Sequence, residues 1–120
     1  MEKQKRIMIA DDDPGILDAV GLMLEFEGYD VSSTLNGATL LNMDGEFPDL
    51  LLLDIWMSGH DGRDICRHLK QNQQTRNIPI VLISASQDIE RSALEAGAND
   101  FLAKPFDMND LLAKIAQHIA

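Results

Sequence analysis

Short apolar runs alternate with helical patterns along the whole chain. Residues 6–10, 50–53 and 78–83 contain unbroken apolar stretches, which are typical of strands covered on both faces. Residues 29–34 alternate between apolar and polar side chains and indicate a half-exposed strand, and residues 101–103 form a short fifth run. We therefore expect five strands, with the three most apolar at the centre of a sheet and residues 29–34 at its edge.

A helical pattern follows each of these strands. Asp13 followed by Pro14 is typical of an N-cap and the first helical position, and Gly28 stands where this first helix ends. Asp107 caps the last pattern, whose apolar stripe at helical spacing comprises Met108, Leu111, Leu112, Ile115 and Ile119. The remaining predictions are helices at 36–43, ended by Gly45 and Pro48, at 62–73, and at 88–96, ended by Gly97, with a loop at 55–62.

Strict alternation of strands and helices predicts an α/β fold with a parallel sheet and helices on both of its faces. Five such units in 120 residues fit the doubly wound, flavodoxin-like (βα)5 arrangement, whose strand order is 2-1-3-4-5. We expect residues 1–120 to form one domain, because the length is that of a single hydrophobic core.

The composition narrows the class of function. The formal net charge is −10, which disfavours direct contact with nucleic acid or an anionic membrane surface. The longest apolar runs fall far short of the roughly 20 residues that span a bilayer. A single cysteine, Cys66, excludes an internal disulfide and fits a reducing compartment, so we expect a cytoplasmic location.

Polar side chains end four of the predicted strands. Asp11 and Asp12 end the first strand, Asp54 the third, Ser84 the fourth and Lys104 the fifth. The carboxyl ends of parallel strands meet at one edge, where open α/β sheets bind ligands near the switch between the first and third strands. We therefore expect these five side chains to lie together in one crevice.

Crowded carboxylates repel one another unless a cation lies among them. Mg²⁺ suits such a site, because it takes one or two carboxylates together with carbonyl, water and phosphoryl oxygens. Lys104 adds a positive charge and Ser84 a hydroxyl, so the predicted set fits a phosphoryl group. Asp54 is then the expected nucleophile, which would form an acyl phosphate.

These residues resemble the receiver domain of two-component response regulators over essentially the whole chain. No single motif is specific, but all of them in this order and at these spacings are highly specific. The matching motifs are Ala10-Asp11-Asp12-Asp13-Pro14, Leu51-Leu52-Leu53-Asp54-Ile55, Asp61-Gly62, Ile83-Ser84-Ala85, Gly97-Ala98 and Lys104-Pro105-Phe106.

The resemblance implies a role for each residue of the site. Asp54 would accept a phosphoryl group from a phosphohistidine of a sensor histidine kinase or a histidine phosphotransfer protein. Mg²⁺, or Mn²⁺ in its place, would be held by Asp11, Asp12, Asp54 and the backbone carbonyl of Trp56. The phosphoryl group would be bound by Ser84, Ala85 and Lys104, with a cis peptide bond between Lys104 and Pro105.

The resemblance also implies a conformational switch. Ser84 and Phe101 would move on phosphorylation and remodel the face made by the fourth helix, the fifth strand and the fifth helix. That face would signal to a downstream effector protein or to a fused output domain. The domain would be no enzyme for other substrates, although it would catalyse its own phosphorylation and dephosphorylation at Asp54.

Four features depart from the commonest family pattern. Ser84 stands where threonine is frequent, Phe101 where tyrosine is also common, and Ser58 where proline is usual. The bulky Trp56 and the small Ser86 occupy two positions that tune water access in the family. We therefore hypothesise that Trp56 shields the phosphoryl group and slows its loss; Trp56 as a simple exposed aromatic or as a binding anchor remains an alternative.

Three other functions are weighed against this one. A phosphorylation-independent interaction module would keep the fold without the chemistry. A flavin carrier would need a phosphate-cradling loop after the first strand, where this chain has Asp11 to Asp13. A metal-dependent phosphatase would need a general acid or a substrate-binding insertion, and the sequence predicts neither. The sequence does not separate a single-domain regulator from part of a larger one.

Overall fold

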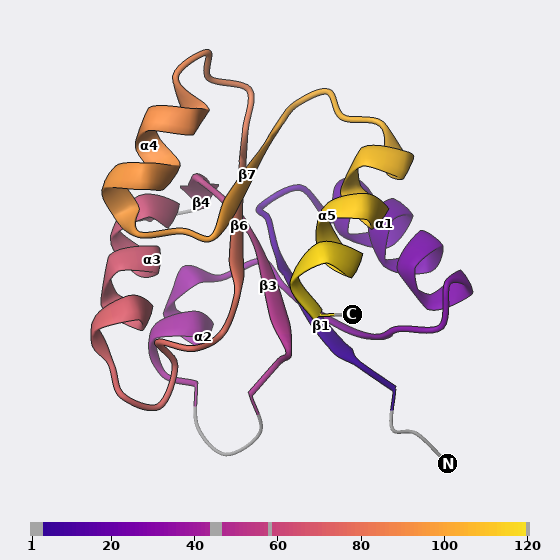
Figure 1. Ribbon diagram of the computed structural model, residues 1–120, viewed down its shortest axis with the longest axis horizontal. Coiled ribbons are helices and arrows are strands. Elements are labelled where there is room, and N and C mark those ends of the chain that lie inside the picture. Colours follow the sequence, from indigo (N-terminus) through magenta and orange to yellow (C-terminus); the bar gives the residue numbers. More distant parts are fainter. Residues whose placement is uncertain (1–3, 44–46, 58, 120) are drawn as a thin grey trace.

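The computed structural model describes residues 4–43, 47–57 and 59–119. Five parallel strands form the main sheet in the order β2-β1-β3-β6-β7 (Figure 1). Because β4 and β5 form a separate small sheet, β6 and β7 are the fourth and fifth strands of the main sheet, and the order is the predicted 2-1-3-4-5. The predictions for Gly45 and Ser58 lie outside the described residues. The strands are β1 (Arg6–Ala10), β2 (Asp30–Thr34), β3 (Leu50–Asp54), β6 (Ile80–Ser84) and β7 (Asp100–Ala103).

Helices cover both faces of the sheet, as predicted. One face carries α1 and α5, and the other carries α2, α3 and α4, which lie on opposite sides of the sheet in Figure 1. The helices are α1 (Pro14–Phe26), α2 (Gly37–Leu41), α3 (Gly62–Gln71), α4 (Ile89–Ala96) and α5 (Met108–Ile119).

The central strand β3 explains how one sheet serves two cores. All five of its residues are buried. Leu51 and Leu53 pack into the core under α2 to α4, whereas Leu50 and Leu52 pack into the core under α1 and α5. Alternate side chains of a strand point to opposite faces, so a strand covered on both sides is apolar until it reaches the edge of the sheet, here at Asp54; this produces the run of four leucines. The strand β2 lies at the edge, as predicted, but it is more exposed than the predicted half-exposed strand, since none of its residues is buried.

The helix ends follow their capping residues. The Asp13 side chain accepts the N–H of Gly15 and Pro14 is the first residue of α1, both as predicted. Gly97 ends α4 with a φ of 81°, a left-handed conformation in which a side chain would be strained. No helix in the described part of the chain is long and apolar enough to cross a membrane.

The predicted loop at 55–62 contains a small hairpin. β4 (Trp56–Met57) and β5 (His60–Asp61) pair in antiparallel fashion, with Trp56 opposite Asp61. Strands of two residues are too short to produce a recognisable alternation, which is why the pattern predicted a loop. At the end of the hairpin, a Cβ on Gly62 would collide with the backbone carbonyl of Asp54. Glycine at this position therefore lets α3 begin directly against the end of β3.

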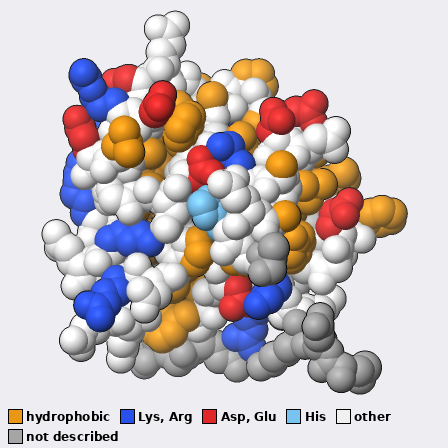
Figure 2. Space-filling view, in the orientation of Figure 1, with side chains coloured by type: hydrophobic (Ala, Val, Ile, Leu, Met, Phe, Trp, Pro, Cys, Tyr) orange, Lys and Arg blue, Asp and Glu red, His pale blue; other side chains and the backbone are white. Residues whose placement is uncertain are grey.

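Basic side chains are distributed unevenly over the surface. Half of the ten lysines and arginines fall between residues 63 and 91. In Figure 2, blue side chains gather on the side of the molecule that α3 and α4 occupy in Figure 1. The basic side chains are therefore concentrated in one part of a chain whose net charge is −10.

Candidate functional site

Four strands end at one edge of the sheet and bring the predicted polar residues together. Asp11 follows β1, Asp54 ends β3, Ser84 ends β6 and Lys104 follows β7. Parallel register aligns these ends: Asp54 is paired with Ile83, and Ser84 with Ala103.

Lys104 is the centre of the cluster. Its Nζ donates to Oδ2 of Asp54 at 2.7 Å and to Oδ2 of Asp11 at 3.1 Å. Burial lowers the pKa of Lys104, but the contacts with the two carboxylates outweigh it and leave this pKa above its usual value. Lys104 is therefore a fixed positive charge between two buried carboxylates.

Asp54 has both carboxylate oxygens engaged. Oδ1 accepts the N–H of Trp56 at 3.0 Å, and Oδ2 accepts the ammonium of Lys104. The residue is only 5 % exposed, at the end of a strand buried on both faces. Its carboxylate is thus oriented by groups on two sides while remaining at the rim of the sheet.

Asp11, Asp12 and Asp54 form an acidic cluster that fits a divalent cation. One carboxylate oxygen from each lies within 4.8 Å of the others. Asp11 is buried, and its burial raises its pKa against the hydrogen bonds from Asp13 and Lys104; the charge of Asp54 raises it further. The three carboxylates and the one ammonium of Lys104 together leave a surplus of negative charge. Carboxylate oxygens are also the ligands that Mg²⁺ prefers.

Ser84 and Ala85 lie beside this cluster. Ser84 is 1 % exposed, and its hydroxyl oxygen accepts the N–H of Ser86 at 3.0 Å. Its backbone carbonyl accepts the N–H of Lys104 at 2.9 Å, which ties the ends of β6 and β7 together. The peptide bond between Lys104 and Pro105 is cis, as the resemblance implied.

A shallow, mainly apolar groove lies between α1 and the loops that follow β6 and β7. Its volume is about 490 Å³, and Lys104 and Asp13 are the charged residues of its lining. The apolar lining comes from the two sides of the groove: Gly15, Ile16, Ala19 and Val20 from α1, and Ala85, Pro105 and Phe106 from the opposite loops. No pattern in the sequence predicts this groove, because it requires the packing of α1 against the loop after β7.

Phe101 lies on β7, three residues before Lys104. It is partly buried and packs against the core under α2 to α4. The ammonium of Lys114 lies 5.2 Å from the centre of its ring. The ring is therefore placed between the core and α5.

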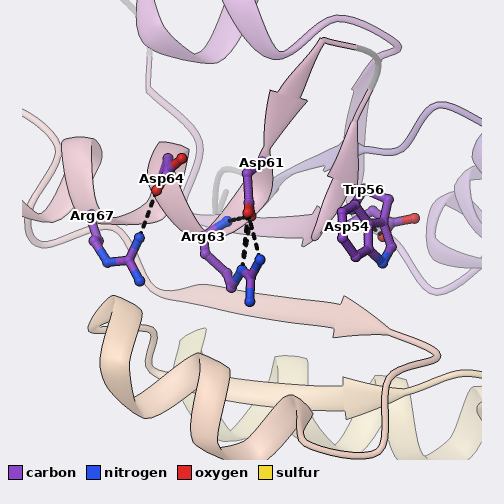
Figure 3. A network of polar contacts seen from close by, with 6 residues as sticks. All are labelled: Asp54, Trp56, Asp61, Arg63, Asp64 and Arg67. Carbon is purple, nitrogen blue, oxygen red and sulfur yellow. Dashed lines mark hydrogen bonds and ion pairs between the residues drawn. The ribbon is translucent and has the colours of Figure 1, made fainter.

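One residue beside the site has no signal in the sequence patterns described above. Arg63 binds the carboxylate of Asp61 through Nε and Nη2, and its Cζ lies 5.9 Å from the centre of the Trp56 ring (Figure 3). The contact with Trp56 depends on the hairpin β4–β5, which the sequence did not predict. The sequence signal that was available is the pair Asp61 and Arg63, two residues apart at a helix start.

Comparison with known proteins agrees with this geometry. The family model of the response regulator receiver domain matches residues 7–116. The transcriptional regulator RpaA of Synechocystis is 36% identical over 113 residues, which are 92% of this chain and 47% of that protein. The response regulator PleD of Caulobacter vibrioides is 41% identical over 92% of this chain and 25% of its own length. The chain therefore spans about half or less of these relatives.

Solved structures agree in fold. A putative response regulator from Chloroflexus aurantiacus has a TM-score of 0.90 and 32% identity, covering 98% of both chains. The receiver domain of the sensor histidine kinase PA1611 from Pseudomonas aeruginosa, which has a magnesium ion in its active site cleft, has a TM-score of 0.88 and 27% identity, again over 98% of both chains. The chain belongs to the family of response regulator receiver domains of two-component systems.

Proposed function

We propose that residues 1–120 form one receiver domain in which Asp54 accepts a phosphoryl group from a phosphohistidine. The observation that carries this proposal is the placement of Asp54, whose Oδ2 contacts Lys104 at 2.7 Å and whose carboxylate lies beside Asp11 and Asp12. A nucleophilic carboxylate, a cluster suited to a divalent cation and an ammonium are the groups that phosphoryl transfer requires.

The proposed reaction makes one bond and breaks one. A carboxylate oxygen of Asp54 bonds to phosphorus, the bond from phosphorus to the donor's imidazole nitrogen breaks, and an acyl phosphate results. Lys104 neutralises charge on the transferred oxygens, while Ser84 and Ala85 supply hydrogen-bonding groups at the end of β6. Hydrolysis reverses the modification: water bonds to phosphorus, inorganic phosphate leaves and the Asp54 carboxylate is restored.

Receiver domains bind Mg²⁺ at an acidic cluster of this kind. Here we propose Asp11, Asp12, Asp54 and the backbone carbonyl of Trp56 as the ligands. A bound Mg²⁺, or Mn²⁺, supplies positive charge among these oxygens and makes a dianionic phosphoryl group tolerable there. Asp12 is the exposed member of the three, so the cluster is open to solvent on its side.

The proposed signal travels from Ser84 and Phe101 to the face made by α4, β7 and α5. Phosphorylation changes the charge around Lys104, and the Lys104 N–H is bonded to the Ser84 carbonyl, so β6 and β7 respond together. An effector protein or a fused output domain would bind this face. The groove beside Lys104 is where a donor carrying the phosphohistidine would approach, and we place these partners in the cytoplasm.

Intact mass tests the proposal. The protein is incubated with a small-molecule phosphodonor, with and without Mg²⁺, alongside Asp54→Asn. We expect one phosphoryl adduct that requires Mg²⁺ and is absent from Asp54→Asn. No adduct with that donor or with a phosphohistidine protein, while Mg²⁺ still binds, would contradict the proposal and favour a phosphorylation-independent interaction module.

A further inference from the structure

The side chain of Arg63 is held in one orientation. Its Nε lies 3.0 Å and 3.2 Å from the two carboxylate oxygens of Asp61, and Nη2 lies 2.7 Å from Oδ2. The backbone N–H of Arg63 also donates to Asp61, the N-cap of α3. The pair lowers the pKa of Asp61, chiefly through this side-chain hydrogen bond. Such a two-point contact fixes the plane of a guanidinium as well as its place.

This fixed cation lies over the ring of Trp56. The distance from Cζ of Arg63 to the ring centre is 5.9 Å, within the range of a cation–π contact. Trp56 is also the cross-strand partner of Asp61 in the hairpin, so the carboxylate that orients Arg63 lies directly opposite the aromatic residue. Trp56 is 62% exposed, and an aromatic residue with that much exposure would otherwise sample several rotamers.

Trp56 is in turn connected to the proposed phosphoacceptor. Its backbone N–H donates to Oδ1 of Asp54, two residues earlier. In the view of Figure 3, Asp54 and Trp56 project at one end of the group and Arg63 and Asp61 lie next to them. A contact between the hairpin and α3 therefore orients the large side chain of a residue whose backbone is hydrogen-bonded to Asp54.

We propose that Arg63 is a positioning residue that holds the Trp56 indole at the mouth of the site and so lengthens the life of the Asp54 phosphoryl group. This inference rests on the proposed function of Asp54. Hydrolysis requires a water molecule to reach phosphorus. The water oxygen bonds to phosphorus, the bond from phosphorus to the Asp54 oxygen breaks, and the water loses a proton to solvent. An indole held in place narrows that approach, whereas a released indole leaves it open for part of the time.

The neighbouring Arg67 is a matched control. It lies one turn further along α3 and pairs with Asp64 at 2.7 Å, but its pair is more exposed than that of Arg63. Arg67→Gln removes the same charge from the same helix and leaves the contact over Trp56 intact. Arg63→Lys keeps the charge of Arg63 but loses the planar fork.

The position of the ring is measured first, without phosphorylation. Trp56 is the single tryptophan of the chain, so quenching of its fluorescence by acrylamide reports its accessibility alone. We expect more efficient quenching in Arg63→Gln, a smaller increase in Arg63→Lys, and wild-type quenching in Arg67→Gln, with thermal unfolding of the same samples confirming that each is folded. Unchanged quenching in a folded Arg63→Gln variant would overturn the inference about Arg63 and leave the proposed function of Asp54 untouched.

The lifetime of the phosphoryl group is measured next, by intact mass after the donor is removed. A cation–π contact at an exposed site corresponds to a change of about two- to fivefold, so we expect decay faster by about this factor in Arg63→Gln and no change in Arg67→Gln. In a Trp56→Ala background, Arg63→Gln should have no further effect. An equal acceleration in that background would overturn the inference, because Arg63 would then act through its charge. A wild-type protein that takes no phosphoryl group would instead overturn the proposed function, and the lifetime part of this inference with it.

Discussion

The strand β7 has an ion cluster at each end, and the two differ in charge balance. After its carboxyl end, Lys104 lies among the carboxylates of Asp11 and Asp54. At its start, Asp100 contacts Lys114 at 2.8 Å and His118 at 3.0 Å. Carboxylates are in excess in the first cluster, whereas basic groups outnumber the carboxylate in the second.

Burial acts on both clusters, but the contacts decide the outcome. Burial raises the pKa of Asp11, and its hydrogen bonds do not compensate. Burial also acts to raise the pKa of Asp100, but bonds from Lys114, His118 and the N–H of Phe101 outweigh it and leave this pKa below its usual value. A partly buried cluster whose charges are balanced needs no further ligand, whereas one with surplus carboxylate is suited to a cation.

Removal of Lys104 gives the largest expected effect. Lys104→Met leaves Asp11 and Asp54 next to each other without their shared ammonium, and we expect a loss of about 2 kcal/mol in the free energy of unfolding without Mg²⁺. Mg²⁺ should restore most of it by binding the same carboxylates. Urea denaturation with and without Mg²⁺ measures both. A variant as stable as wild type without Mg²⁺ would show that these carboxylates do not depend on Lys104.

Replacement of the lysine at the other end of β7 should lower the free energy of unfolding by less. Lys114→Met leaves Asp100 with His118 and the Phe101 N–H, so we expect a loss of about 1 kcal/mol. Since this cluster has no surplus carboxylate, Mg²⁺ should not change that loss. Urea denaturation under the same two conditions provides the comparison, and recovery of Lys114→Met by Mg²⁺ would contradict the distinction between the clusters.

The pH dependence should have opposite signs at the two ends. The raised pKa of Asp11 means that the folded state prefers its protonated form, so its ionisation weakens folding as the pH rises through the folded pKa. Asp11→Asn should therefore be more stable than wild type at neutral pH without Mg²⁺.

The lowered pKa of Asp100 gives stability that is present above the ordinary value of 3.8 and lost as the pH falls through the folded pKa. Asp100→Asn should be less stable than wild type at neutral pH, with the difference closing below that value. Thermal unfolding from pH 7 to pH 3 checks both; equal signs would contradict the comparison.

The exposed pair on α3 should give the smallest effect. Arg67 and Asp64 are three residues apart, with side chains 42% and 73% exposed. Solvent screens such a pair, so Arg67→Gln should change the free energy of unfolding by about 0.3 kcal/mol, by urea denaturation. A loss as large as that of Lys114→Met would mean that partial burial does not separate these ion pairs.

The sequence predicted what depends on repeated local patterns. The run of leucines before Asp54, the cap at Asp13 and the stop at Gly97 each appear in the structure as expected. The meeting of Asp11, Asp54 and Lys104 was also predicted, because parallel strands carry their carboxyl ends to one edge. The geometry of the cluster thus followed from topology, while the roles of its residues remain proposals.

The contacts that the sequence missed join residues without a pattern. The side chain of His118 is 18% exposed and pairs with Asp100, eighteen positions earlier, and no spacing in the sequence predicts this contact. Arg63 was not singled out, because its place over Trp56 requires a hairpin of two-residue strands. Pairings of this kind are determined by how elements pack, and neither hydrophobic periodicity nor residue type reveals them.

Location of the modified residue tests the distinction between the two ends of β7 most directly. After phosphorylation, reduction with borohydride converts an acyl phosphate into homoserine, and peptide mapping by mass spectrometry then identifies the position. We expect homoserine at Asp54 and unmodified aspartate at Asp100. Homoserine at any other aspartate, or phosphate retained on a histidine such as His60, would contradict the assignment of Asp54 as the phosphoacceptor.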